Sequence, residues 1–282
     1  SGGGRPLLSP AVRRLLAEHE ISVHEVAGSG RNGRITAEDV VRAASRAGTG
    51  DNSRIPHSPI RRRIAEHMAQ SLQQAPHVTT LFEADLTRVL AHRARCAGSF
   101  EAREVHLTLT AYFIVACARA LLAHPQLNST FRDDALELHA DANIGVGTAL
   151  GQEGIIVPVL HRAQELDLFG AAMRLARLVA AARAGTLAPP DVRGGTFTIS
   201  NHGVAGSLLA APIVIHQPQV AILGVGKVER RVCAVMVDGA EMIAIRSMCY
   251  LTLTIDHRAI DAFQANAFLA SVVAALEQWP AD

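Results

Sequence analysis

The chain has 282 residues, of which 49% are hydrophobic, 19% charged and 4% aromatic. This length fits one large domain, or a large and a small one, with enough apolar residues for a substantial core. Because the formal net charge is only +1, the composition argues against nucleic acid and against a polybasic membrane-binding surface. The longest apolar run, residues 107–123, contains two threonines and an arginine and is too short and too polar to span a bilayer.

Two residue counts narrow the chemistry further. Four cysteines without CxxC spacing are typical of reduced thiols in a cytosolic protein, and they argue against a structural zinc site. Lys227 is the single lysine and lies in a Gly-Val-Gly-Lys context that is not a Walker A loop. Schiff-base and P-loop chemistry therefore have almost no candidate residue, and we expect chemistry without a bound metal.

The N-terminal part of the chain predicts a very small domain after a linker or cloning remnant at residues 1–6. Within residues 7–44, Ser9 and Pro10 favour a helix start, a glycine-rich loop follows at residues 26–34, and Thr36 favours the start of a second helix. Four arginines of this unit form either a basic face for an acidic partner or a plain exposed polar face: Arg13, Arg14, Arg31 and Arg34.

Residues 45–58 are rich in Gly, Ser, Asn and Pro and predict a flexible linker. Residues 59–282 predict one large α/β domain. The helices expected from apolar periodicity are residues 60–72, 107–123, 168–184 and 263–278. The expected strands are residues 78–85, 142–148, 155–159, 196–200, 220–225, 232–237 and 243–255. Because these elements do not alternate strictly, the order argues against a simple Rossmann pattern.

His257 and Asp261 are the leading catalytic candidates. They lie four residues apart, directly after the expected strand at residues 243–255. A strand that delivers a histidine, with a carboxylate one short turn later, is a way to build an oriented general base for transfer chemistry. With thirteen histidines in the chain, a histidine near an aspartate is, on this spacing alone, more often an ordinary surface or core residue than a general base.

Two further groups carry candidate roles. Ser200 and Asn201 end the expected strand at residues 196–200; the hydroxyl could donate to a developing oxyanion, or these residues could simply form a turn. Residues 61–63, three consecutive arginines, could contact a phosphate-bearing cofactor, or could be the solvated start of a helix.

With these motifs together, the chain resembles the dihydrolipoamide acyltransferases, the core components of 2-oxo acid dehydrogenase complexes. Residues 9–13 and 28–35 resemble the peripheral subunit-binding domain of that family. The blocks that resemble the catalytic domain follow in chain order: residues 60–65, 76–79, 124–128, 154–158, 194–201, 218–224 and 256–261.

The resemblance implies a chloramphenicol-acetyltransferase-like fold, with a mixed sheet and helices on its faces, preceded by the two-helix domain. It implies a homotrimer that assembles into a cubic or dodecahedral cage, with each active site in a channel between subunits. His257 would be the general base, Asp261 would mainly orient local structure, and Ser200 from a neighbouring subunit would hold the tetrahedral intermediate. The coenzyme A path would be lined by Ser200, Asn201, Gly224 and Gly226, with Arg61 at the phosphates.

The same resemblance implies protein partners and a separate domain that carries lipoate. Residues 7–44 would bind dihydrolipoamide dehydrogenase and the thiamine-dependent decarboxylase. Lys227 is not in the hairpin setting of a lipoyl lysine, so we expect lipoate on an upstream domain. The sequence departs from the family pattern where Ala262 follows Asp261 in place of glycine, and at His67 and Ala17, where basic residues are common.

We expect a branched-chain acyl group, on the resemblance of the Ser-Asn-His-Gly turn and the Gly-Val-Gly-Lys block. Acetyl- and succinyl-transferring members remain alternatives. So does a catalytically silent core that tethers dihydrolipoamide dehydrogenase, and so does a stand-alone acyltransferase with another acceptor. The Arg- and Ala-rich composition favours a bacterial cytoplasm over a mitochondrial matrix.

Overall fold

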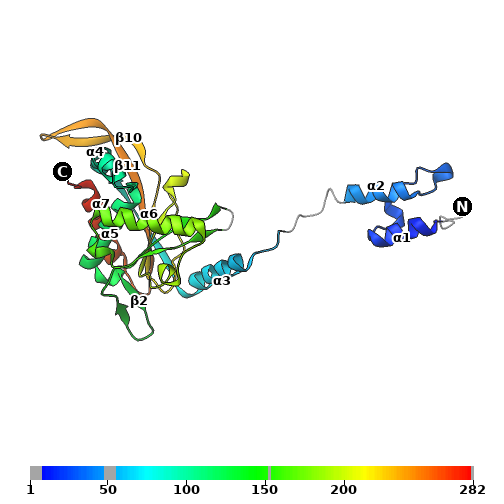
Figure 1. Ribbon diagram of the computed structural model, residues 1–282, viewed down its shortest axis with the longest axis horizontal. Coiled ribbons are helices and arrows are strands. Elements are labelled where there is room, and N and C mark those ends of the chain that lie inside the picture. The colour runs from blue at the N-terminus through cyan, green and yellow to red at the C-terminus, as the bar shows by residue number, and fades with distance from the viewer. Residues whose placement is uncertain (1–7, 48–54, 152–153, 281–282) are drawn as a thin grey trace. The chain divides into compact units, whose positions relative to one another are not determined.

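The computed structural model describes residues 8–47, 55–151 and 154–280. The chain divides into two compact units, residues 1–57 and residues 58–282 (Figure 1). Each unit has its own hydrophobic core.

The described part of the small unit contains two helices and two short 3₁₀ turns: α1 (Pro10–Glu18), η1 (Val23–Glu25), η2 (Arg31–Gly33) and α2 (Ala37–Ala47). The Ser9 hydroxyl caps α1 by accepting a hydrogen bond from the Val12 amide at 3.3 Å. The core consists of five apolar residues: Val12, Leu16, Val26, Ile35 and Val40.

One buried carboxylate fixes the loop of the small unit. Asp39 accepts hydrogen bonds from the backbone amide and the hydroxyl of Ser29, at 2.8 and 2.7 Å, and from the Thr36 amide at 3.0 Å. Because Ser29 lies in the glycine-rich loop and Thr36 precedes α2, these bonds tie the loop to the start of the second helix.

The large unit contains a mixed sheet in the order β1-β11-β9-β8-β4-β7, with β10 also paired to β11. β8 is parallel to both β4 and β9, and the other pairs are antiparallel. The expected mixed α/β fold is therefore confirmed. The strands are β1 (His77–Asp85), β4 (Ile144–Val146), β7 (Val159–Leu160), β8 (Phe197–Asn201), β9 (Ala221–Val225), β10 (Glu229–Val237) and β11 (Ala240–Asp256).

Two small sheets flank the main one. β2 (Ser129–Phe131) pairs with β3 (Leu136–Leu138), and β5 (Thr148–Ala149) pairs with β6 (Ile155–Ile156). The strands expected at residues 142–148 and 155–159 are thus each divided between two sheets. Pro158 lies between β6 and β7, where it has no amide hydrogen to donate.

Five α-helices and several 3₁₀ turns complete the described part of the large unit. The helices are α3 (Pro59–Gln74), α4 (Thr87–Glu101), α5 (Leu109–Ala123), α6 (Leu168–Ala184) and α7 (Ala262–Glu277). The turns are η3 (Pro125–Leu127), η5 (Ala163–Glu165), η6 (Pro189–Val192) and η7 (Gly203–Ala205). Across the described residues, we find no helix that combines the length and the apolar character needed to cross a membrane.

Alternation along β8 separates the two faces of the sheet. Phe197 and Ile199 are fully buried, and Phe197 packs against Phe268 of α7. Thr198 and Ser200 point to the other face, where they line a hollow together with residues of α3. This is the period-2 alternation of a strand that is covered on both sides.

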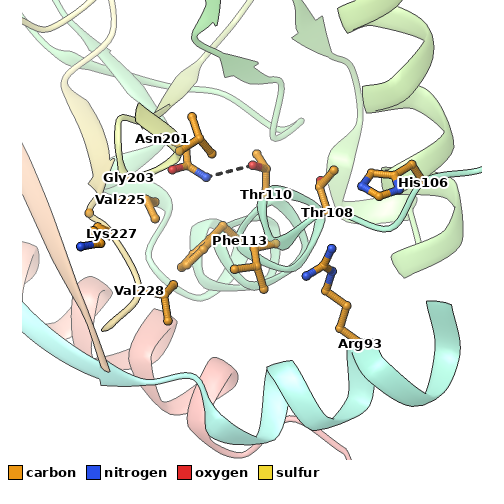
Figure 2. Close-up of a pocket in the computed structure, with 13 residues that line it drawn as sticks. Arg93, His106, Thr108, Thr110, Phe113, Asn201, Gly203, Val225, Lys227 and Val228 are labelled. Atoms are coloured by element: carbon orange, nitrogen blue, oxygen red, sulfur yellow. Dashed lines mark hydrogen bonds between the residues drawn. The ribbon is translucent and has the colours of Figure 1, made fainter. Parts of the chain in front are cut away.

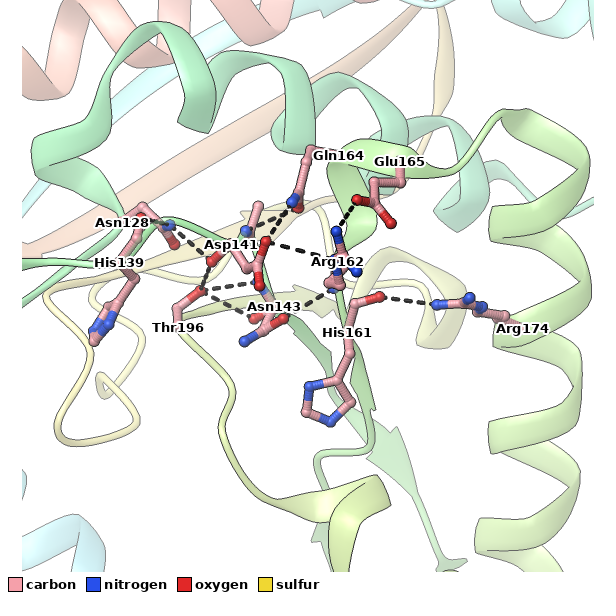
Figure 3. Close-up of polar contacts among 11 residues, drawn as sticks. Asn128, His139, Asp141, Asn143, His161, Arg162, Gln164, Glu165, Arg174 and Thr196 are labelled. Carbon is pink, nitrogen blue, oxygen red and sulfur yellow. Dashed lines mark hydrogen bonds and ion pairs between the residues drawn. The ribbon is translucent and has the colours of Figure 1, made fainter.

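A polar network closes the end of the sheet at which β4 and β8 begin (Figure 3). The Asn143 amide donates to the Thr196 hydroxyl, and the Thr196 amide donates to the Asn143 carbonyl. The Asn143 side chain accepts from the Arg162 amide at 2.9 Å, and the Gln164 amide group donates to Asp141 at 2.7 Å. These bonds fix the loops that surround this end of the sheet.

Two features are not predicted by the sequence pattern: α4 and the β2–β3 hairpin. The buried side of α4 carries Val89 and His92, and the arginines that flank these residues, Arg88, Arg93 and Arg95, obscure the apolar stripe. Each strand of the hairpin has only three residues, which is too short for a clear alternation.

We predict that Asp39→Asn destabilises the small unit at neutral pH more than in acid. Hydrogen bonds from Ser29, and then from Thr36, hold the pKa of the Asp39 carboxyl well below its usual range. A lowered folded-state pKa adds stability that is present above the unfolded-state pKa of about 3.9 and is lost as pH falls toward the folded-state value. Thermal unfolding of the full chain should be followed through the NMR signals of residues 8–45. The difference in Tm between variant and wild type should shrink below about pH 4. A difference that is independent of pH would contradict this assignment.

Candidate functional site

His257 lies in the turn that follows β11, with its side chain 40% exposed. Its backbone amide donates to the Pro76 carbonyl at 2.9 Å. Its Nδ1 atom lies 3.8 Å from Oδ1 of Asp261, which is within ion-pair range but longer than a hydrogen bond. The predicted pair is therefore brought together, with the imidazole accessible.

Asp261 immediately precedes α7, and its side chain is 74% exposed. Its backbone amide donates to the Gln264 side chain at 3.1 Å, which helps to fix the start of the helix. Ala262 is the first residue of α7 and so has right-handed helical backbone. Alanine in place of the family glycine therefore incurs no left-handed strain here.

Ser200 lines a hollow of about 680 Å³ between α3 and the sheet. Among the described residues, its hydroxyl has no hydrogen-bond partner. Arg61 and Arg63 line the same hollow, and their guanidinium groups form no ion pair with any described residue. No carboxylate appears among the described lining residues, so the hollow combines a free hydroxyl with uncompensated positive charge.

Two histidines lie on the wall of the Ser200 hollow. The rings of His67 and His216 are 4.8 Å apart between centroids. Burial lowers the pKa of His216, and the neighbouring His67 lowers it further. His216 was not a candidate from the sequence, because no motif distinguishes it from the other histidines.

Asn201 and Gly226 lie at a second hollow, of about 390 Å³ (Figure 2). The Asn201 amide group donates to the Thr110 hydroxyl of α5 at 3.1 Å. Arg93 and Lys227 also line this hollow. Because neighbouring strand residues point to opposite faces, Ser200 and Asn201 open onto different hollows.

Gly224 is hydrogen-bonded into the middle of the sheet and lines neither hollow. A Cβ atom at this position would lie 2.3 Å from the Thr252 hydroxyl and 2.5 Å from the Ile213 side chain. The residues expected along the coenzyme A path therefore divide into three places: Ser200 and Arg61 in one hollow, Asn201 and Gly226 in the other, and Gly224 in the sheet.

Ser200 and His257 lie at opposite ends of the sheet within one chain. Ser200 of β8 is paired with Gly224, near the end of β9. Ile255 of β11 is paired with Ala221, at the start of β9, and β11 then continues beyond this point toward His257. Strand geometry of about 3.3 Å per residue and 4.8 Å between strands then separates the two residues by roughly 20 Å. One chain cannot apply both side chains to the same carbonyl group.

The four candidate partner-binding arginines of the small unit are all exposed: Arg13, Arg14, Arg31 and Arg34. None of them forms an ion pair with another described residue. Arg13 and Arg14 belong to α1, and the other two belong to η2 or follow it directly. Over the described ranges, no cluster of three or more His, Cys, Asp or Glu side chains is arranged to hold a metal ion.

Two family models match the chain. Residues 49–281 match the catalytic domain of the 2-oxoacid dehydrogenases acyltransferase family. Residues 6–41 match a domain described as E3-binding.

Curated relatives with three different acyl groups match at similar identity. The chain is 37% identical to the acetyltransferase component of the pyruvate dehydrogenase complex of Mycobacterium bovis, over 96% of this chain and 54% of the relative. It is 34% identical to the lipoamide acyltransferase component of the branched-chain alpha-keto acid dehydrogenase complex of Bacillus subtilis, over 95% and 70%. It is 34% identical to the succinyltransferase component of the 2-oxoglutarate dehydrogenase complex of Rickettsia typhi, over 94% and 69%. The chain spans about half the length of the first of these.

Solved structures share the fold of the large unit. A probable dihydrolipoamide acetyltransferase from Listeria monocytogenes superposes with a TM-score of 0.76 at 38% identity, covering 82% of this chain and 96% of that one. The cubic core of a pyruvate dehydrogenase multienzyme complex gives a TM-score of 0.76 at 29% identity, covering 82% and 94%.

We predict that Gly224→Ala destabilises the large unit by about 1–3 kcal/mol, because the added methyl group overpacks the sheet against Thr252 and Ile213. Gly147→Ala is the matched control, since a Cβ atom there has no neighbour closer than 3.7 Å. In urea unfolding, the midpoint of Gly224→Ala should lie well below the midpoint of Gly147→Ala. Equal midpoints for the two variants would show that the sheet can absorb the methyl group.

Proposed function

This chain belongs to the 2-oxoacid dehydrogenase acyltransferase family, and on that premise we propose that it transfers an acyl group between a dihydrolipoyl thiol and coenzyme A. The observation that carries the proposal is the Ser200 hollow, which is lined by a hydroxyl and two guanidinium groups that have no partner among the described residues. A thioester with a phosphate-bearing arm needs both features.

The proposed chemistry is direct transthioesterification. Neutral His257 takes the proton from the attacking thiol as sulfur bonds to the thioester carbon, because a free thiol is mostly protonated at neutral pH. Ser200 donates a hydrogen bond to the oxyanion of the tetrahedral intermediate. The carbon–sulfur bond to the other thiol then breaks, and His257 returns the proton to the departing sulfur. Asp261, at 3.8 Å, orients the imidazole.

Coenzyme A is proposed to enter the Ser200 hollow. Arg61 would hold its phosphates, because guanidinium groups recognise phosphate oxygens in a bidentate manner. Asn201 and Gly226 would contact the molecule only where its path passes from one hollow to the other between neighbouring chains. Gly224 would act indirectly, by allowing the strands that carry these residues to approach closely.

The catalytic unit is proposed to be a homotrimer in which Ser200 of one copy faces His257 of the next. The separation of roughly 20 Å within one chain supports this arrangement, because a tetrahedral intermediate must contact both residues at once. Trimers would assemble into a cubic or dodecahedral cage. The likeness to a cubic core supports the first form.

Residues 7–44 are proposed to bind dihydrolipoamide dehydrogenase and the thiamine-dependent decarboxylase. Four exposed arginines, which form no ion pair within the described part of the chain, would meet acidic surfaces of these partners: Arg13, Arg14, Arg31 and Arg34. Lipoate would be carried on a domain upstream of residue 7. The proposed location of the protein is a bacterial cytoplasm, which the bacterial origin of the matched relatives supports.

A branched-chain acyl group is proposed as the natural one. The described wall of the Ser200 hollow is rich in aliphatic side chains, including Ile64, Met68, Ile213 and Ile222, which favour an uncharged, branched acyl group. Relatives that transfer acetyl, succinyl or branched-chain groups match equally well, so the resemblance alone does not choose between them.

We predict that His257→Ala lowers kcat for acyl transfer from acyl-coenzyme A to free dihydrolipoamide by about 10²–10⁴-fold, and Ser200→Ala by about 10²–10³-fold. Rates with isobutyryl, acetyl and succinyl thioesters should be highest for isobutyryl. An acetyl preference would end the branched-chain proposal, and a wild-type chain that is assembled but inactive would favour a silent core.

We predict that the two inactive variants restore activity when they are assembled together. A mixed trimer of Ser200→Ala and His257→Ala copies contains centres that combine an intact Ser200 with an intact His257 from the neighbour. Random one-to-one assembly should recover about a quarter of wild-type activity. Co-refolding with no recovery, in trimers shown to be mixed, would place both residues in one chain.

We predict that Arg61→Ala raises the KM for acyl-coenzyme A by about 10- to 100-fold, because a hydrogen bond to a charged group contributes about 1.5–3 kcal/mol. The KM for dihydrolipoamide should stay unchanged. Arg62→Ala is the matched control, since Arg62 is exposed on the same helix but does not line the hollow. Equal effects of the two substitutions would remove Arg61 from the binding site.

A further inference from the structure

The residues on either side of His257 are tied to each other through their side chains. Asp256 is 1% exposed and accepts from Nη2 of Arg258 at 2.7 Å and from Nε at 3.0 Å. The Arg258 backbone amide also donates to the Asp256 carboxylate, at 3.0 Å. This is the planar, two-point contact that arginine makes with a carboxylate and lysine cannot reproduce.

The backbone around His257 is held from three directions. The Asp256 amide donates to the Val220 carbonyl, and its carbonyl accepts from the amides of Ala259 and Ile260. The His257 amide donates to Pro76. Since both neighbours of His257 are fixed to each other, the direction in which its imidazole leaves the backbone depends on the Asp256–Arg258 pair.

One face of the Arg258 guanidinium is covered by an aromatic ring from an element distant in the sequence. The guanidinium carbon of Arg258 lies 4.4 Å from the ring centroid of Phe131, which ends β2. A guanidinium over an aromatic face is attracted by the ring quadrupole, and more strongly when water is excluded. Arg258 is 34% exposed, so Phe131 covers one face of the guanidinium while part of the group stays open to solvent.

We propose that Phe131 is a positioning residue for His257, which acts through the Arg258–Asp256 pair. The ring of Phe131 keeps the guanidinium in the plane that engages the buried carboxylate. That engagement fixes the turn from which the imidazole projects. The inference rests on the proposed function of His257 as general base, but it assigns a role to the β2–β3 hairpin that the chemistry alone does not require.

The test compares the full, assembled chain with Phe131→Leu, Phe131→Tyr, Arg132→Met and Leu136→Ala in acyl transfer from isobutyryl-coenzyme A to free dihydrolipoamide. Phe131→Leu should lower kcat about tenfold with both KM values within about twofold, because a small misplacement of a catalytic group lowers the rate without weakening binding. Phe131→Tyr keeps the aromatic face and should stay within about twofold of wild type.

Two variants separate positioning from general damage to the hairpin. Arg132 is the next residue of the same hairpin and pairs with Glu137 at 2.8 Å rather than with Asp256; Arg132→Met should leave kcat unchanged. Leu136 lies opposite Phe131 in the β2–β3 ladder; Leu136→Ala loosens the hairpin without removing the ring. If Leu136→Ala lowers kcat as much as Phe131→Leu, or if Phe131→Leu has wild-type kcat, the inference is wrong.

If Phe131→Leu does not assemble, Arg258→Lys provides the second measurement. It keeps the positive charge next to buried Asp256 but loses the planar fork, and it should lower kcat with little change in either KM. Wild-type kcat for Arg258→Lys would overturn the inference. His257→Ala tests the underlying proposal separately. If activity survives in His257→Ala, His257 is not the general base. If His257→Ala is inactive but Phe131→Leu has wild-type activity, only the positioning role of Phe131 is wrong.

Discussion

The direction of β9 is the constraint on which the proposed site depends. β9 runs parallel to β8 and antiparallel to β11, so the carboxyl ends of its two neighbours emerge at opposite ends of the sheet. Ser200 lies next to the last residue of β8, and His257 directly follows β11. The observed topology therefore keeps the two side chains roughly 20 Å apart within one chain, and this separation supports the proposal of a centre shared between neighbouring copies.

The helical layer keeps this arrangement rigid. α5 is buried on nearly all sides, and aromatic contacts link Phe268 of α7 to Phe197 at the start of β8. The polar network around Asn143 and Thr196 fixes the same end of the sheet. Ser200 therefore projects from a strand with little freedom to shift, as a group that must meet a developing charge requires.

Sequence reasoning succeeded where a single local pattern carries the structure. The Ala- and Leu-rich period of α6 predicts its observed bounds, and the long alternation before His257 predicts β11. It failed for α4, whose buried side includes a histidine, and for β2–β3. The pairing of Asp256 with Arg258 under Phe131 could not be predicted, because it depends on a contact between segments more than a hundred residues apart. The identity of the acyl group cannot be predicted from a local sequence pattern either, because it depends on the shape of a hollow lined by several elements.

Lys227 gives the chain an unusual handle for chemical labelling. It is the single lysine in the 282 residues, its side chain is 47% exposed, and it lies at the rim of the hollow that Asn201 and Gly226 also line. An amine-directed fluorophore would therefore modify one side chain, next to Glu229 and beside this hollow. Its emission would report occupancy of the hollow directly, without an engineered cysteine or a coupled enzyme assay.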